Sequence, residues 1–104
     1  MQYRQGDVFI ERTNSKITGA EVPRSAGRVV LAYGEVTGHA HAITRPGVTM
    51  FRDAKLNRVF LHVPAGDAAE LEHEEHETIR LPPGDYEIIH QREYSPEEIR
   101  RVTD

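Results

Sequence analysis

Short runs rich in β-branched and aromatic residues are separated by glycine, proline and asparagine at nearly regular intervals along this chain. In many of these runs apolar and polar side chains alternate. This pattern is typical of half-buried strands, because successive side chains of a strand point to opposite faces. Several such strands in a row, divided by turn signals, indicate an all-β domain. The expected strands are residues 7–12, 28–33, 39–43, 48–52, 58–63, 69–73, 77–81 and 86–93.

The fold expected from this pattern is a small antiparallel β-barrel or β-sandwich that forms a single domain over residues 1–104. A chain of 104 residues can bury a modest core, and because it has no cysteine it must do so without disulfides. After the last strand, Ser95-Pro96-Glu97-Glu98 combines a capping serine, a proline at the first helical position and a glutamate at the third. This order predicts a short C-terminal helix. Residues 14–27 are polar and are expected to form a surface loop.

Four of the six histidines stand in two short segments, and they are the strongest functional signal in the sequence. His39 and His41 flank Ala40 on an expected strand, so their side chains share one face and stand about 6–7 Å apart. Two imidazoles on one face suit neighbouring positions on a single metal ion. The alternative interpretation is that both are exposed polar residues that alternate with buried alanines.

The second pair lies in His73-Glu74-Glu75-His76. A spacing of three suits one turn of helix or a bulged strand, whereas on a regular strand the two side chains would face opposite sides and only one would reach the site. His73 is favoured because it shares the face of Leu71. Glu74 and Glu75 offer a carboxylate ligand or a general base, and we take Glu75 as the catalytic candidate. The alternative is an acidic loop that faces water.

Imidazole is the commonest protein ligand for zinc, iron, copper and nickel, so the histidines predict a metal site. Because the chain has no cysteine, the ligands must be nitrogen and oxygen atoms. The expected ligands are His39, His41, His73 and His76, and the expected cofactor is a divalent metal, Zn, Fe or Mn. Three histidines with an open position would let Zn activate water, whereas an added carboxylate would suit Fe or Mn. Arg92 is a second catalytic candidate that would hold an anionic substrate, and its alternative is a structural ion pair.

Parts of the sequence resemble the two motifs of cupins. Gly34 precedes the pair His39 and His41 by about the interval of the first motif. Pro82-Pro83-Gly84, with His90 on the following strand, resembles the second motif. The resemblance implies a β-barrel that binds Fe, Mn, Zn or Ni, with His39, His41 and His90 as ligands. Cupins include oxygenases, isomerases and sugar-binding proteins. The two histidine segments are also similar to the signatures of a small, uncharacterised bacterial protein family.

Three functions are compatible with these features. The first is a metal-binding domain, such as a metal-dependent hydrolase or other cupin-like enzyme, that acts on a small-molecule or phosphate-bearing substrate. The second is a metal-independent phosphodiesterase or ribonuclease-like enzyme, in which histidines act as general base and general acid. The third is a non-catalytic module that binds a protein partner through an edge strand or the terminal helix.

The formal net charge of −4 and the pI of about 5.8 argue against broad nucleic-acid binding, which needs a positive surface. No segment is long and apolar enough to span a membrane, and the N-terminal residues lack the apolar core of a signal peptide. We therefore expect a cytoplasmic protein. Because small open sheets often hide an edge by pairing with a second copy, we also expect a homodimer.

Overall fold

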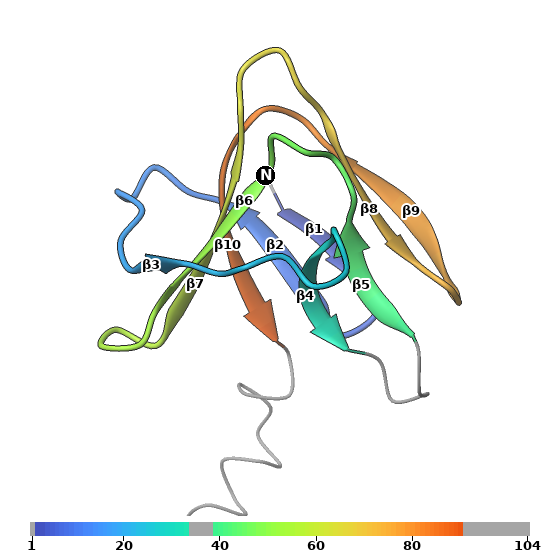
Figure 1. The fold of residues 1–104 in the computed structure, drawn as a ribbon, viewed down its shortest axis with the longest axis horizontal. Helices are drawn as coiled ribbons and strands as arrows, with labels where there is room; N and C mark the ends of the chain where they lie inside the picture. The colour runs from blue at the N-terminus through green and yellow to red at the C-terminus, as the bar shows by residue number, and fades with distance from the viewer. Residues whose placement is uncertain (1, 34–38, 91–104) are drawn as a thin grey trace, which may run out of the picture.

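The computed structural model describes residues 2–33 and 39–90, which form ten strands in two antiparallel sheets (Figure 1). These described residues include no helix, and so no helix with the length and hydropathy needed to cross a membrane. The strands are β1 (Gln2–Gln5), β2 (Val8–Arg12), β3 (Ala20–Glu21), β4 (Val29–Tyr33), β5 (Ala40–Ile43), β6 (Thr49–Asp53), β7 (Arg58–Val63), β8 (Ala69–His73), β9 (His76–Leu81) and β10 (Gly84–His90).

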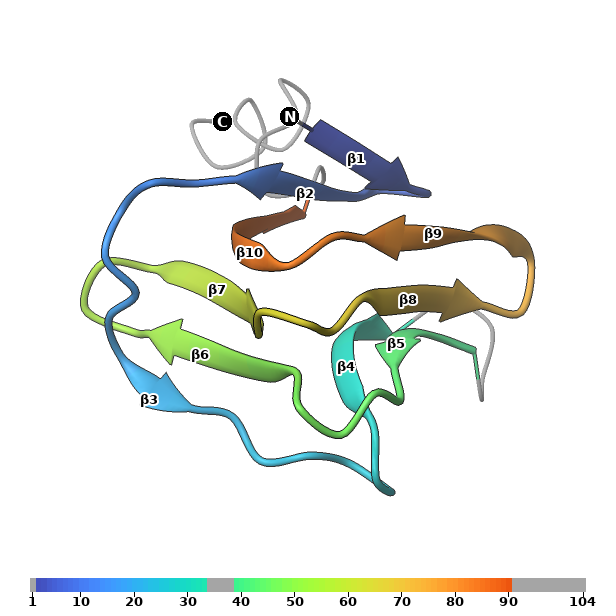
Figure 2. The ribbon, with the colours of Figure 1, turned by 90° about the horizontal axis from the view of Figure 1, so that it is seen from above.

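The larger sheet has six strands in the order β1-β2-β10-β7-β6-β3, and the smaller has four in the order β4-β5-β8-β9 (Figure 2). β10 pairs with both β2 and β7, so the last described strand lies between strands from the first and middle parts of the chain. β1, at one edge of the larger sheet, also contacts β9, at one edge of the smaller sheet. The two sheets meet along this side, but no ladder joins them into a closed barrel within the described residues.

The hydrophobic core draws its residues from both sheets. Ile10 and Tyr86 come from the larger sheet, Ile43 and Leu71 come from the smaller one, and all four are completely buried. Burial of each such side chain contributes about 1.5–3 kcal/mol. The Tyr86 hydroxyl donates a hydrogen bond to the carbonyl oxygen of Pro82, so the polar atom of this core ring is also satisfied.

Most of the expected strands are confirmed to within one or two residues, and β7 and β8 have the predicted bounds. Two strands were not expected: β1, which is polar, and β3, which has two residues and lies in the expected loop. Both are edge strands, so neither needs the regular alternation that reveals a half-buried strand. The closed-barrel alternative is wrong, because the strands form two separate sheets. The helix predicted from Ser95, and the end of the last strand beyond His90, lie outside the described residues.

Candidate metal centre

A hairpin places His73 and His76 opposite each other. Only Glu74 and Glu75 separate β8 from β9, and His73 pairs directly with His76 across the ladder. Directly opposed residues of an antiparallel pair project to the same face. The regular-strand interpretation, in which only one of the two histidines reaches the site, is therefore wrong, because the spacing of three spans a turn and not one strand.

A bulge in β9 makes this pairing compatible with the core. Between the pair Leu71–Ile79 and the pair His73–His76, β8 advances by two residues while β9 advances by three. On a regular strand Glu77 would share the face of Ile79. Because β9 has one extra residue here, His76 and not Glu77 lies on the face of Ile79. The bulge therefore lets an apolar core residue and a site histidine, three residues apart, serve the same side of the sheet.

The other two histidines come from β5 and the residue before it. His41 lies on β5 and is 3% exposed, and His39 directly precedes the strand. The His73 ring lies between the others, because its centroid is 4.3 Å from that of His41, 4.6 Å from that of His76 and 5.7 Å from that of His39. The centroids of His41 and His76 are 5.7 Å apart. All four histidines predicted as metal ligands thus lie in one cluster, with His73 at its centre.

Gln5, at the end of β1, holds His41 in one orientation. The Gln5 side-chain nitrogen Nε2 donates to the carbonyl oxygens of Leu71 (2.9 Å) and Glu77 (2.8 Å), so both of its hydrogens are used. The amide oxygen Oε1, 2.8 Å from His41 Nδ1, can only accept. His41 must therefore carry its proton on Nδ1, which leaves the lone pair of Nε2 for another partner. Orientation of a histidine through its second nitrogen is typical of metal ligands.

His41 is also kept neutral. Burial, followed by the neighbouring charges of His73 and His76, lowers the pKa of His41 from 6.5 to about 4. A neutral imidazole is the form that binds metal ions. At neutral pH this buried ring therefore has both the protonation state and the tautomer of a ligand that coordinates through Nε2.

Gly6 supplies the space that His41 and His76 occupy. A Cβ atom built at Gly6 would lie 3.0 Å from His76 Nε2 and 3.3 Å from His41 Cε1. The backbone φ of Gly6 is 59°, a conformation that other residues rarely adopt. The same edge of both rings therefore approaches one point of the backbone, and only glycine leaves room for this approach.

Glutamates of the hairpin turn surround the exposed rim of the cluster. His39 Nδ1 lies 2.9 Å from a carboxylate oxygen of Glu75, and the backbone N–H of Glu75 donates to His73 Nδ1 at 3.0 Å. Glu74 accepts a hydrogen bond of 2.9 Å from the backbone N–H of Ala40, which lowers the pKa of Glu74 below its ordinary value. One ligand atom from each of His39, His73 and Glu74 lies within 4.8 Å of the other two. The rim thus offers a mixed nitrogen and oxygen ligand set that shares His73 with the set formed by His41, His73 and His76.

Comparison with known proteins gives one match. Residues 4–91 match the family model described as Domain of unknown function (DUF8820). The chain belongs to the DUF8820 family. No curated protein and no solved structure matches it. The matched segment includes Gln5 and all four clustered histidines, so the DUF8820 domain contains the whole candidate site.

The two histidines outside the cluster, His62 and His90, have hydrogen-bond partners of their own. Arg92 lies outside the described residues. His90, the third ligand implied by the cupin resemblance, donates from Nε2 to the carbonyl oxygen of Leu31 at 3.1 Å. His62 belongs to the six-stranded sheet, where its Nδ1 lies 2.6 Å from Asp85. The family match is to DUF8820 and not to a cupin family.

Sequence reasoning missed Gln5 and Gly6. Neither residue stands near a histidine in the sequence, and the polar segment around them has no apolar alternation that would have revealed β1. The available signal was Gly6-Asp7, a turn-forming pair that follows a glutamine and precedes a confident strand. That signal predicts a turn in DUF8820 but not its contact with the histidines.

Proposed function

We propose that this DUF8820 domain binds a divalent transition-metal ion through His41, His73 and His76, with His39 at the rim of the site. The observation that carries the proposal is the fixed state of His41, which is buried, neutral and protonated on Nδ1 by its contact with Gln5. This state leaves a free lone pair on His41 Nε2, in a ring whose nearest aromatic neighbours are two further histidines. The donor set of nitrogen and carboxylate oxygen atoms fits Zn, Fe or Mn.

The spacing of the three rings suits a shared metal ion, but the rings must rotate before their nitrogens converge on it, because the planes of His41 and His76 are only 21° apart. Nitrogen ligands of a tetrahedral zinc ion lie about 2.0–2.1 Å from the metal, which places the centroids of their rings about 5 Å apart. The centroids of the three proposed ligands are 4.3–5.7 Å apart. In the structure, His73 Nδ1 accepts a hydrogen bond from the backbone N–H of Glu75. Coordination by His73 through this atom would replace that hydrogen bond.

A hydrolytic role is the chemistry we infer for such a site. Zinc held by three histidines keeps a position for water and lowers the pKa of that water to about 7. Because the Glu75 carboxylate can only accept, His39 Nδ1 donates to it and His39 Nε2 keeps a lone pair that can take a proton. In this proposal His39 is the general base, and Glu75 orients His39 without touching the reacting atoms.

The pair formed by His39 and Glu75 also supports a second candidate, a metal-independent acid–base enzyme. In that case His39 would be the base and another histidine of the cluster the acid, as in a phosphodiesterase or ribonuclease-like reaction. The two candidates differ in their response to chelators, because only the first loses activity when metal is removed.

The test is metal analysis of untagged protein by mass spectrometry after separate incubation with Zn, Fe(II), Mn and Ni, followed by gel filtration. We expect about one equivalent of one metal in the wild type. His76→Ala is the main variant, because His76 is exposed and its loss leaves the core intact. His62→Ala is the matched control, because His62 lies on the other sheet.

Metal that disappears in His76→Ala and persists in His62→Ala is the expected result. Equal metal in the two variants, or none in the wild type under any of the four conditions, would overturn the proposal. His41→Ala is a further variant, and circular dichroism must show that it is folded before its metal content is compared.

A further inference from the structure

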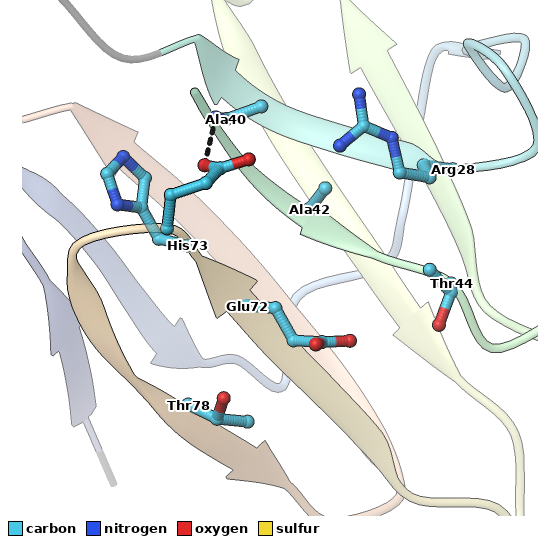
Figure 3. Close-up of a pocket in the computed structure, with 8 residues that line it drawn as sticks. Arg28, Ala40, Ala42, Thr44, Glu72, His73 and Thr78 are labelled. Carbon is cyan, nitrogen blue, oxygen red and sulfur yellow. Dashed lines mark hydrogen bonds between the residues drawn. The ribbon is translucent and has the colours of Figure 1, made fainter. Parts of the chain in front are cut away.

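A groove lies on the outer face of the four-stranded sheet, beside the histidine cluster (Figure 3). On β5, Ile43 belongs to the core, so Ala40 and Ala42 point to the opposite, outer face. Both alanines are nonetheless no more than 4% exposed, because longer side chains stand around them. The result is a hollow of about 250 Å³ with a floor of methyl groups. Its other lining residues are Arg28, Thr44, Glu72, His73, Glu74 and Thr78.

Opposite charges stand on the two sides of this floor. Arg28 precedes β4, on one side of β5, and Glu72 lies on β8, on the other side, directly opposite Ala42. Two strand spacings separate them, which is about 10 Å between backbones. Within the described residues neither Arg28 nor Glu72 forms a side-chain hydrogen bond or ion pair, and Arg28 is only partly exposed. A partly buried guanidinium that no described side chain pairs with favours an anionic group in the groove, because a buried charge is costly unless it is paired.

The far end of the groove carries the second negative charge. Glu74 accepts a hydrogen bond from the backbone N–H of Ala40. Figure 3 shows Ala40 beside His73, away from Arg28 and Thr44. Ala40 begins β5 and Thr44 directly follows it, so about 13 Å of extended chain separates these two lining residues. A simple anion would be attracted to Arg28 but repelled by the two glutamates. A simple cation would be attracted to the glutamates but repelled by Arg28.

We propose that this groove binds a small zwitterion, with its carboxylate on Arg28 and its ammonium group on Glu72. Arg28 offers the two-pronged hydrogen bonding that suits a carboxylate, and the alanine floor receives the carbon chain between the charges. Hydroxyl groups of Thr44 and Thr78 add hydrogen-bonding capacity along the walls.

The groove also reaches the proposed metal centre. His73 and Glu74 line it, and His73 is the ring at the centre of the histidine cluster. The zwitterion would then be the substrate class of that centre, a statement that rests on the proposed function. The recognition of its two charges by Arg28 and Glu72 does not depend on the proposed function, because neither residue is a proposed metal ligand.

The test is a titration of metal-free protein, dialysed against EDTA, followed by ¹⁵N NMR at low ionic strength. The probes are the ω-amino acids from β-alanine to 6-aminohexanoate, with glutarate as the dianion control and 1,5-diaminopentane as the dication control. We expect one ω-amino acid to shift the amide signals of residues 40–44 and to bind at least 10-fold more tightly than either control. Arg28→Gln and Glu72→Gln should each weaken its binding about 10-fold or more.

Arg80→Gln is the matched variant, because Arg80 is exposed on β9 and does not line the groove. It should leave the affinity unchanged. Equal or tighter binding of glutarate or the diamine, an equal loss in Arg80→Gln, or no binding by any probe would each overturn the proposal. Because the protein is metal-free throughout, these outcomes are independent of the metal analysis. Binding without metal uptake would refute only the metal centre, and metal uptake without binding would refute only the zwitterion site.

Discussion

Replacing Gln5 with leucine would remove three hydrogen bonds beside the histidine cluster while keeping a buried side chain of similar size. Two of the groups left without a partner, His41 Nδ1–H and the carbonyl oxygen of Leu71, are buried. An unsatisfied buried group costs about 1–3 kcal/mol, so these two together cost about 2–6 kcal/mol. The carbonyl of Glu77 is only partly buried and can turn to water, so we add nothing for it.

The assay is urea denaturation, with Gln2→Leu as the matched control. Gln2 lies on the same strand but is exposed, and its side chain makes a long hydrogen bond of 3.3 Å to Glu11. We expect Gln5→Leu to lower the free energy of unfolding by about 2–6 kcal/mol, and Gln2→Leu to change it by less than about 0.5 kcal/mol.

A second readout tests the tautomer of His41. Long-range ¹H–¹⁵N spectra of the histidine rings should show His41 protonated on Nδ1 alone in the wild type, and a mixture of tautomers in Gln5→Leu. If Gln5→Leu has the stability of Gln2→Leu and the His41 ring signals do not change, the reasoning about this contact is refuted.

Three further outcomes follow from the structure. Because the unfolded chain protonates His41 near its ordinary value of 6.5 and the folded chain only near pKa 4, stability should fall as the pH decreases from 6.5 to 4. The free energy of unfolding should decrease by about 3 kcal/mol over this range in the wild type and should not decrease for this reason in His41→Gln. Urea titrations at several pH values would measure both. Gly6→Ala should destabilise the protein by about 1–3 kcal/mol and shift the NMR signals of the His76 ring, because the new Cβ meets that ring at a positive φ. An unchanged melting curve and unchanged ring signals would contradict this. Leu71→Ala, in the core below the site, should cost about 2–5 kcal/mol in the same denaturation assay. A cost below about 1 kcal/mol would mean that the sheets do not pack there as described.

The strands that contribute to the core could be predicted because their alternation records which face is buried. Arg58–Val63 illustrates this, since Leu61 and Val63 alternate toward the core and the predicted bounds agree with the structure. β1 left no such record, because its two inward-facing residues are Tyr3 and Gln5, so burial alternates along the strand without an alternation of apolar residues. Sequence periodicity therefore reports packing, and it does not report pairing at a sheet edge.

The four histidines of the cluster could be named from the sequence, but the hairpin that pairs His73 with His76 could not be predicted. Two-residue hairpins usually have glycine or asparagine at positive φ, and Glu74 and Glu75 have neither these residue types nor that conformation. The turn was therefore hidden, and with it the pairing of His73 with His76. Gln5 was hidden for another reason: its partners stand 36 to 72 positions away in sequence, and only the meeting of the two sheets brings them together.

This meeting of the sheets has a mechanical consequence. Gln5 belongs to the six-stranded sheet, whereas His41, His73 and His76 belong to the four-stranded sheet. A fluctuation that parts β1 from β9 would release His41 from its orienting partner while every histidine kept its place on its own sheet. His41 would then lose its fixed orientation before either sheet unfolds. Hydrogen exchange at β1 would measure how often this separation occurs in the native protein.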